Sequence, residues 1–191
     1  MQNSDNPKVS LLVPICNVER YLRECLDSAV AQTLKDIEII CINDGSTDSS
    51  PDIIREYMER DPRAKMIDKA NSGYGDSMNC GLEMARGEYV GILESDDFMF
   101  EDSLKKLVAK ADAEHADVVK GDFYLYWSTP SERRELFGII DEHMTGAAYR
   151  PVDRPGIFYR KPSIWSAIYR REFLNDNQIR FLPTPGASYQ D

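Results

Sequence analysis

Short apolar runs rich in β-branched residues alternate along this chain with longer segments whose apolar residues recur every three or four positions. The apolar runs are KVSLLVPI (8–15), DIEIICIN (36–43), KMIDK (65–69) and YVGIL (89–93). The periodic segments cover residues 17–34, a stretch that begins at Ser50 and Pro51, residues 74–85 and about 101–114. Because strands that alternate with helices pair in parallel under a helical cover, the sequence predicts an α/β fold with a doubly wound, mainly parallel sheet flanked by helices.

The pattern changes after residue 115. The segment ADVVKGDFYLYW (116–127) starts a fifth strand, and SIWSAIYRREFL (163–174) resumes a helical pattern. Between them, residues 129–162 show no clear period and are expected to form loop and short elements laid over one end of the sheet. The sequence therefore predicts a disordered polar tail, an α/β core and a further segment of the same domain, at residues 1–7, 8–128 and 129–191.

The composition disfavours several classes of function. Hydrophobic residues make up 42% of the 191 residues, which favours a globular domain over a disordered chain. The formal net charge of −10 disfavours binding to nucleic acid and generic binding to anionic lipid, although it leaves room for a local cationic site. The sequence shows neither an N-terminal apolar leader, which would indicate secretion, nor an apolar run of about 18 residues, which would indicate a transmembrane segment. A cytoplasmic location is therefore predicted.

Cysteine, histidine and glycine usage narrows the chemistry further. The four cysteines form no CxxC pair and are predicted to be buried free thiols, as in a reducing compartment. The two histidines, His115 and His143, are too few for a histidine-rich zinc site. The turn after the first strand, PICNVERY, lacks the glycines of a dinucleotide-binding loop, and neither a P-loop motif nor a G-x-S-x-G elbow occurs.

Polar clusters follow three of the predicted strands, as PICN, NDGSTD and ESDD. Ligands of doubly wound sheets bind at the carboxyl ends of the strands, so these clusters predict one shared site. In ESDD, the acids Glu94, Asp96 and Asp97 offer hard oxygen ligands for a divalent cation that holds a diphosphate. The alternatives are that Asp96 or Asp97 caps the following helix, and that NDGSTD is an ordinary Asx turn and cap.

Four segments carry a resemblance to a known family: VSLLVPICNVERYLRECLDSAVAQT (9–33), IEIICINDGSTDSS (37–50), NSGYGDSMNCGLEMARGEYVGILESDD (71–97) and SIWSAIYRREFLNDNQIRF (163–181). In order and spacing they resemble the glycosyltransferases of family 2, which have the GT-A fold with a Rossmann-like nucleotide-binding half. The resemblance implies an inverting transfer of a sugar from a nucleotide diphosphate sugar, a UDP-sugar, to a hydroxyl acceptor such as a growing glycan.

The resemblance also implies a cofactor, partners and a location. A divalent cation, Mn²⁺ or Mg²⁺, is expected to assist departure of the diphosphate. The expected partners are the nucleotide-sugar donor and a saccharide or lipid-linked glycan acceptor, with no nucleic acid. A position at the inner face of the membrane is the alternative to a free cytoplasmic one.

Site residues follow from the resemblance position by position. The residues expected to contact the nucleotide are Pro14, Ile15, Cys16, Asn17, Asn43, Asp44, Asn71, Gly73, Asn79 and Ser95. Asp44 would accept a hydrogen bond from the uracil N–H, which favours uracil over cytosine. Asp96 would be the main metal ligand, with Glu94 and Asp97 ligating, orienting water or holding the ribose. The family usually has aspartate where this chain has Glu94, which is one methylene longer.

The acceptor side is assigned to residues 129–191. By resemblance Asp191 is the general base that takes the proton from the acceptor hydroxyl, and a merely solvated terminal aspartate is the alternative. The family's sequence continues beyond this point, so this acceptor-side segment is expected to be C-terminally truncated. Tyr126, Trp127 and Trp165 are candidates for stacking on sugar rings, or else for packing in the core.

Two other functions compete with sugar transfer. A catalytically degenerate nucleotide-sugar-binding module would explain the departure at Glu94. A sugar-nucleotide pyrophosphorylase would share a related fold, but it requires a loop rich in glycine and arginine after the first strand, where this chain has PICNVERY. Turnover of a panel of donors, with free nucleotide as the readout, separates these functions.

Overall fold

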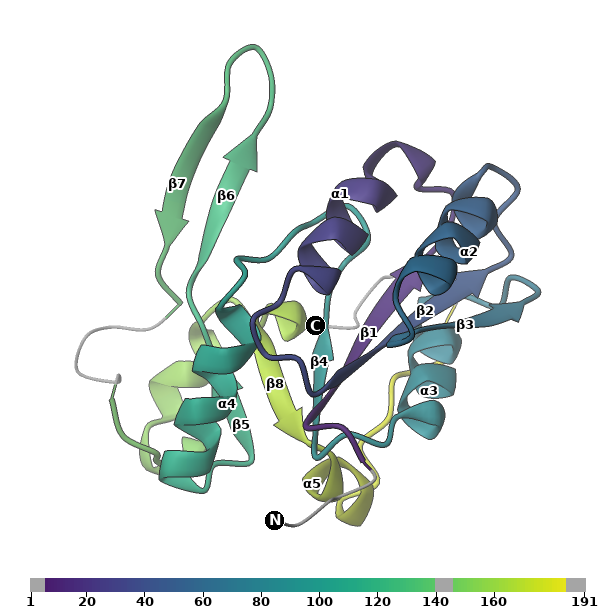
Figure 1. Cartoon of the computed structure of the whole chain (residues 1–191). Coiled ribbons are helices and arrows are strands. Elements are labelled where there is room, and N and C mark those ends of the chain that lie inside the picture. The colour runs from purple at the N-terminus through teal and green to yellow at the C-terminus, as the bar shows by residue number, and fades with distance from the viewer. Residues whose placement is uncertain (1–5, 140–145, 185–191) are drawn as a thin grey trace.

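A computed structural model describes residues 6–139 and 146–184 of the chain. Its centre is a six-stranded sheet in the order β3-β2-β1-β4-β8-β5 (Figure 1). The strands are β1 (Val9–Ile15), β2 (Ile37–Asp44), β3 (Ala64–Lys69), β4 (Tyr89–Ile92), β5 (Val118–Lys120) and β8 (Ala167–Arg170). β3, β2, β1 and β4 pair in parallel, and β8 pairs antiparallel with both β4 and β5. The predicted α/β class with a mainly parallel sheet is confirmed.

Helices cover both faces of this sheet (Figure 1). They are α1 (Glu19–Val30), α2 (Ser50–Arg60), α3 (Tyr74–Met84), α4 (Ser103–Glu114) and α5 (Arg171–Asp176). One core cluster joins α1, α2 and α4 to the sheet, and a second joins α3 and α5 to the opposite face. Because both faces are covered, every residue of β1 and β2 is buried, which explains why their sequences read as continuous apolar runs.

The sequence misassigned residues 163–174, which it predicted to be helical. Ile164–Ser166 is a short 3-10 helix, Ala167–Arg170 is strand β8, and α5 begins only at Arg171. The apolar spacing in this segment fits a helix, but four residues are too few for periodicity to separate helix from strand. The neighbouring strands β4 and β5 both offer backbone hydrogen bonds, and their pairing with β8 decides the conformation.

The predicted fifth strand is in fact two strands that belong to different sheets. β5 lies in the main sheet, whereas β6 (Phe123–Trp127) pairs with β7 (Arg133–Phe137) in a separate hairpin that projects beyond the sheet (Figure 1). Strand β7 lies inside residues 129–162, which were expected to form loop and short elements. The predicted boundary between residues 128 and 129 falls in the turn of this hairpin, and β8, from beyond it, belongs to the core sheet. The division into core and acceptor-side segment stays a prediction.

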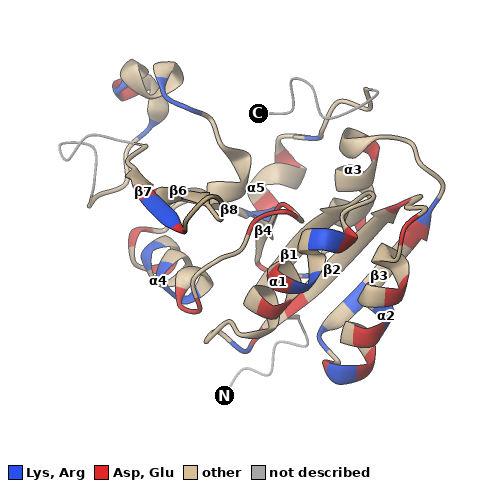
Figure 2. Cartoon of the chain, turned by 90° about the horizontal axis from the view of Figure 1, so that it is seen from above, with Lys and Arg blue, Asp and Glu red and all other residues tan. Residues whose placement is uncertain are grey.

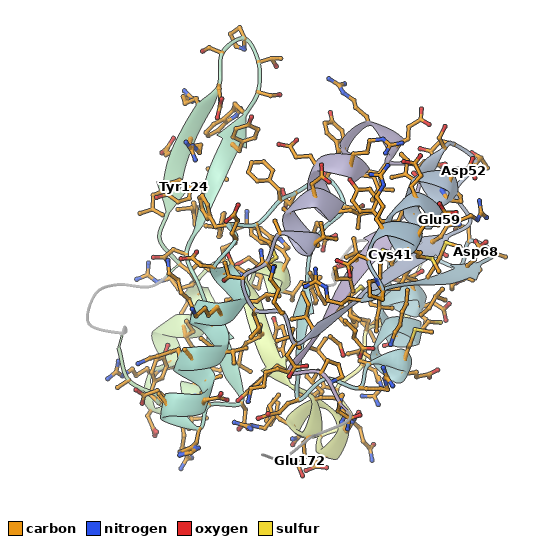
Figure 3. The ribbon with its side chains drawn as sticks, viewed as in Figure 1. Cys41, Asp52, Glu59, Asp68, Tyr124 and Glu172 are labelled. Carbon is orange, nitrogen blue, oxygen red and sulfur yellow. The ribbon has the colours of Figure 1, made fainter. Side chains whose placement is uncertain are left out.

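Aromatic side chains hold the hairpin against the rest of the chain. Tyr126 packs edge-on against Phe98 with ring centroids 5.1 Å apart, and Tyr124, which is 46% exposed, packs in the same way at 5.7 Å from Phe100 (Figure 3). On the other face, Trp165 contacts Phe123 at 4.5 Å. An isolated two-stranded hairpin is marginal in water, so these contacts are what keeps it in place.

The cysteines only partly match their prediction. Cys25 and Cys41 are buried free thiols, and burial raises the pKa of Cys41 to about 12 (Figure 3). Cys16 is exposed and Cys80 is half-buried, so the prediction of burial is wrong for these two. Over the described part of the chain, no helix is long and apolar enough to cross a membrane.

A buried polar network joins three strands at the far end of the sheet. The Glu38 carboxylate, 3% exposed, accepts hydrogen bonds from Ser10 Oγ at 2.6 Å, Lys65 Nζ at 2.6 Å and the Arg86 amide at 2.8 Å. Gly87 lies next to this network, three residues beyond the end of α3 at Met84. A Cβ at Gly87 would lie 2.4 Å from the Ser10 amide, so close approach to β1 explains this glycine.

Candidate functional site

The carboxyl ends of β1, β2, β3 and β4 meet at one edge of the sheet, because these four strands are parallel. The strand order runs 3-2-1 to one side and continues with β4 on the other, so the order reverses between β1 and β4. Ligands of doubly wound sheets bind in the crevice at such a reversal. Figure 2 views the chain from above and shows the acidic residues of the loop that follows β4 (red) at this edge.

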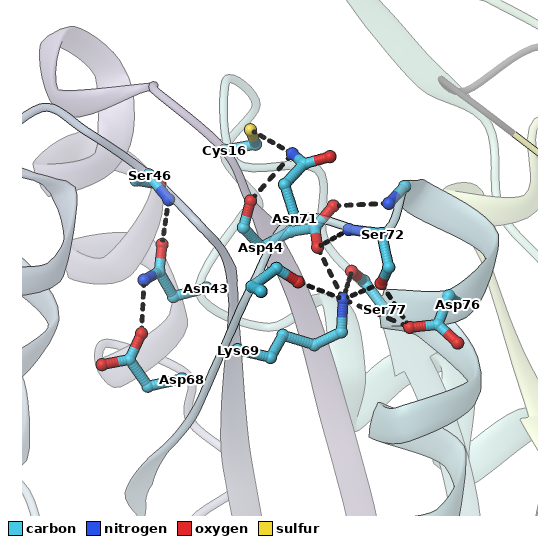
Figure 4. Close-up of polar contacts among 12 residues, drawn as sticks. Cys16, Asn43, Asp44, Ser46, Asp68, Lys69, Asn71, Ser72, Asp76 and Ser77 are labelled. Carbon is cyan, nitrogen blue, oxygen red and sulfur yellow. Dashed lines mark hydrogen bonds and ion pairs between the residues drawn. The ribbon is translucent and has the colours of Figure 1, made fainter.

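Asp44, the last residue of β2, organises the loop that follows β3 (Figure 4). Its side chain accepts hydrogen bonds from the Ser72 amide at 2.9 Å and the Gly73 amide at 3.0 Å, and it forms an ion pair with Lys69 Nζ at 2.6 Å. Lys69 also lies 3.2 Å from both Asp76 and Ser77 Oγ, and it donates a hydrogen bond to Ser72 Oγ. The Asp44 carboxylate, which the resemblance assigned to binding of the uracil ring, is thus held in place by contacts within the protein.

These contacts set the charge of the pair. Burial by itself would raise the pKa of Asp44, but Lys69 and the amides of Ser72 and Gly73 outweigh it and hold the pKa below the ordinary 3.8. Burial lowers the pKa of Lys69, and hydrogen bonds to Asp44 and Asp76 more than compensate, so its pKa is raised. Asp44 is therefore an ionised acceptor and Lys69 a cation at neutral pH.

Close backbone packing holds the same loop on β2. Gly45 has a φ of +68°, and a Cβ there would lie 2.6 Å from the Asn71 amide. Asn71 in turn donates from Nδ2 to the Asp44 carbonyl at 2.9 Å and to Cys16 Sγ at 3.4 Å (Figure 4). The ends of β1, β2 and β3 are joined in this way through Cys16, Asp44 and Asn71, three of the predicted nucleotide residues.

The turn after β1 and the turn after β2 are tied together by side-chain to backbone hydrogen bonds. Asn17 Oδ1 accepts from the Thr47 amide at 2.8 Å, and the Asn17 amide donates to Ser46 Oγ at 3.0 Å. Asp48 Oδ2 accepts from the Glu19 amide at 2.9 Å, and so caps the first turn of α1. Within NDGSTD, the capping role that was the alternative to nucleotide binding belongs to Asp48. Asp44 instead holds the loop that follows β3.

The acids behind β4 form a turn closed by the Asp97 amide, which donates to the Glu94 carbonyl at 3.0 Å. Glu94 is half-buried and accepts a hydrogen bond from the Tyr74 hydroxyl at 2.6 Å. The displacement of water around Asp97, together with the charge of Asp96, raises the pKa of Asp97. The helix-capping alternative is wrong, because α4 begins only at Ser103 and is preceded by Asp102.

A divalent cation would relieve this crowding of charge. Asp96 and Asp97 are exposed and lie next to each other in the chain after β4, so their carboxylates are available as oxygen ligands. In the described residues, no three His, Cys, Asp or Glu side chains converge as metal ligands. Mg²⁺-type sites need no such cage, because they use one or two carboxylates and complete their shell with substrate phosphates and water. The residues present therefore fit a cation that arrives with a diphosphate.

The remaining predicted residues lie in different places. Pro14 and Ile15 are buried within β1, and Ser95 is 9% exposed. Asn43 is also buried and bridges Asp68 Oδ1 at 2.7 Å and the Ser46 amide at 3.2 Å (Figure 4). These four residues are therefore buried at the carboxyl ends of the strands.

Asn79 on α3 has a role that the sequence did not indicate. Its side chain makes two hydrogen bonds, both 2.9 Å, with the backbone N–H and C=O of Phe181. The Phe181 ring also packs edge-on against Tyr74, the partner of Glu94, at 6.1 Å between centroids. Asn79 therefore tethers the chain that leads toward the predicted base. Asp191 itself lies outside the described residues.

Sequence reasoning missed Lys69 and Tyr74. Lys69 ends the third predicted strand, so its position at the shared edge could have been inferred, but nothing in the sequence pairs it with Asp44. Tyr74 opens a predicted helix, and no local pattern links its hydroxyl to Glu94, twenty residues later. Both contacts join segments that only the folded sheet brings together.

Comparison with known proteins identifies the family. The model of the family described as glycosyl transferase family 2 matches residues 10–176. The chain belongs to glycosyl transferase family 2. The uncharacterized glycosyltransferase EpsJ of Bacillus subtilis is 35% identical over 92% of this chain and 53% of its own length. Overall, the chain spans about half or less of the length of the curated relatives it matches first.

Solved structures of related proteins show the same fold. Residues 1–349 of S. aureus TarS in complex with UDP-GlcNAc align with a TM-score of 0.73 and 29% identity, over 92% of this chain and 48% of that one. The mannosyltransferase PcManGT of Pyrobaculum calidifontis, in complex with GDP-Man and Mn²⁺, aligns with a TM-score of 0.64 at 20% identity, over 93% and 48%. This family 2 chain therefore has the GT-A fold.

Proposed function

We propose that this chain binds a UDP-sugar and a divalent cation at the β1/β4 edge and transfers the sugar, with inversion, to a hydroxyl of a glycan acceptor. The observation that carries the proposal is that a family 2 chain brings three elements to one edge: the fixed Asp44 carboxylate, the interlocked turns after β1 and β2, and the acidic turn Glu94–Asp97. TarS, the 29% identical structure, was solved with UDP-GlcNAc, which supports a UDP-sugar donor.

Asp44 would read the base. A carboxylate has about four lone-pair sites, and the amides of Ser72 and Gly73 together with Lys69 use three of them. One acceptor site remains for the N–H of uracil. Cytosine presents a bare ring nitrogen at that position, so an ionised acceptor would discriminate against it.

Asp96 would hold the cation, with Asp97 and Glu94 ligating or orienting water and ribose. When bound, the cation would offset the negative charge that develops on the departing diphosphate. Tyr74 fixes the Glu94 carboxylate, which keeps one member of the acidic turn in a set orientation. Because the pKa of Asp97 is raised, a proton would compete with a cation at this carboxylate, so donor affinity should weaken as the pH falls.

Asp191 would act as the general base. In a single inverting step the acceptor oxygen bonds to the anomeric carbon, the bond from that carbon to the diphosphate oxygen breaks, and the hydroxyl proton passes to a carboxylate. That carboxylate must lie on the face of the sugar opposite the diphosphate. The tether between Asn79 and Phe181 supports a general base from this part of the chain, because it holds residue 181 on α3, whose first residue, Tyr74, binds Glu94.

The cation assignment is tested by isothermal titration of UDP with and without Mn²⁺. Asp96→Asn should fold but lose most of the Mn²⁺-dependent gain in affinity, at least tenfold. Asp102→Asn is the matched control, because Asp102 is a nearby acid that pairs with Lys106 on α4. Unchanged Mn²⁺-dependent affinity in Asp96→Asn would remove Asp96 from the site.

Turnover decides between an enzyme and a binding module. A panel of UDP-sugars is incubated with the chain and glycan acceptors, and released UDP is measured. Acceptor-dependent UDP release supports transfer. Tight donor binding without any release would favour the degenerate binding module.

A further inference from the structure

Residues 149–162, here called the basic-aromatic segment, combine exposed apolar and basic side chains. Val152, Phe158 and Tyr159 are 65%, 69% and 91% exposed, which makes them the three most exposed large apolar side chains that the structure describes. The basic residues of the same segment are Arg150, Arg154, Arg160 and Lys161, all of them exposed. Exposed apolar side chains that gather in one place mark a contact surface.

The basic-aromatic segment does not contribute to either core. It forms two 3-10 helices, Pro151–Asp153 and Pro155–Tyr159, and neither contains a buried residue. Figure 2 shows these short helices standing away from the sheet, at the upper left. Phe158 and Tyr159 are therefore exposed on a segment outside both cores and are not core residues that are incompletely covered.

The charge of the basic-aromatic segment is opposite to that of the whole chain. Four basic residues and one acid, Asp153, give it a net charge of +3, whereas the chain carries −10. Salt screens charges over about 8 Å at physiological ionic strength. Because the two short helices stand away from the sheet, an anionic surface could approach Arg150 and Arg154 without contacting the acidic edge of the sheet, whereas Lys161 lies close enough to Asp97 to act on its pKa.

Cations and aromatic rings lie together in this region. The Arg154 guanidinium lies 4.7 Å from the centre of the Tyr149 ring, and Lys161 Nζ lies 5.5 Å and 5.7 Å from the Phe123 and Phe137 rings. At a bilayer interface, aromatic rings enter the boundary between headgroups and acyl chains, while lysine and arginine contact lipid phosphates. A lipid surface needs no shape complementarity, which suits a short segment without a groove.

We propose that the basic-aromatic segment docks the protein on an anionic lipid bilayer. Phe158 and Tyr159 enter the headgroup boundary, and Arg150 and Arg154 contact lipid phosphates. This inference goes beyond the proposed function and does not depend on it. It gives the alternative location predicted from the sequence, at the inner face of a membrane, a surface through which to act.

Vesicle co-sedimentation without nucleotide tests the proposal. The full chain is mixed with phosphatidylcholine vesicles that contain about one third phosphatidylglycerol, and with pure phosphatidylcholine vesicles. Binding is expected only to the anionic vesicles and should weaken in about 0.5 M salt. Arg150→Gln with Arg154→Gln should reduce the partition constant about 25-fold, because each cation near such a surface contributes about fivefold. Phe158→Ser with Tyr159→Ser should reduce it at least tenfold, to the level of a purely electrostatic contact.

Matched controls separate the segment from general charge and hydrophobicity. Lys105→Gln with Lys106→Gln removes two exposed cations from α4, and Tyr21→Ser removes a 42% exposed ring from α1. Both controls should bind vesicles as the wild type does, and all variants should keep the wild-type unfolding midpoint. The proposal is overturned if the wild-type chain does not bind anionic vesicles, if it binds neutral ones equally, or if the segment variants bind like the controls.

Discussion

Asp44→Ala probes the contact that organises the candidate site. The substitution removes the acceptor of two backbone amides and one ammonium, at 2.9, 3.0 and 2.6 Å. A hydrogen bond to a charged group contributes about 1.5 to 3 kcal/mol. The Gly73 amide is buried and loses its acceptor entirely, whereas Ser72 is exposed and Lys69 keeps Ser77 and Asp76. The free energy of unfolding should therefore fall by about 3 kcal/mol, which for a chain of this length lowers Tm by about 9 °C.

The pH dependence of this effect has a definite sign. The pKa of Asp44 is held below 3.8 in the folded chain, so the contribution is present above the unfolded value and is lost as the pH falls through the folded pKa. The unfolding midpoints of wild type and Asp44→Ala should differ fully at about pH 6, and the difference should shrink progressively as the pH falls below about 4. Asp52→Ala is the control, because Asp52 is exposed and pairs only with Arg55 among the contacts described. Equal midpoints, or a gap that does not shrink in acid, would refute the reasoning.

The same variant separates base recognition from loop order. Lys69→Met keeps the carboxylate of Asp44 but loosens the loop, so it should weaken UDP and CDP alike. Asp44→Ala should in addition reduce the ratio of UDP to CDP affinity, because it removes the acceptor that we propose for the uracil N–H. Titration of both nucleotides on both variants measures this ratio. An unchanged ratio in Asp44→Ala would leave Asp44 as an organiser of the loop only.

Two further outcomes are expected. Burial by itself would raise the pKa of Glu38, but hydrogen bonds from Lys65, Ser10 and the Arg86 amide outweigh it and hold the pKa below 4.5. Glu38→Gln should therefore lower the free energy of unfolding in urea by about 2 kcal/mol at neutral pH, and by less as the pH falls below 4.5. A loss that does not depend on pH would contradict this. Asp191→Asn should leave UDP affinity unchanged while transfer, measured as acceptor-dependent UDP release, falls at least about a hundredfold; near-normal transfer would place the base elsewhere.

Local sequence determined the alternation of strands and helices and the edge of the sheet where the site forms. The predicted strands at 8–15 and 36–43 agree with β1 and β2 to within one residue at each end. The prediction succeeds because a strand buried on both faces needs a continuous apolar run. The polar clusters after β1, β2 and β4 meet because parallel strands end at the same edge, which follows from topology alone.

Only the tertiary structure decided β8, and the reason is that its conformation depends on distant partners. Residues 167–170 have an apolar spacing that suits a helix, yet the open sides of β4 and β5 supply the hydrogen bonds that make them a strand. The split of the predicted fifth strand has the same origin, since β6 pairs with β7 instead of continuing β5.

The chemistry of the site divides in the same way. The sequence placed Asp44 and the acids Glu94, Asp96 and Asp97 at one edge, because residue type and strand position are local properties. It could not show that Lys69 and the Gly73 amide hold Asp44, or that Tyr74 holds Glu94. Those contacts join residues at least twenty positions apart. These residues meet only because the parallel strands end at the same edge of the sheet and bring the following loops together.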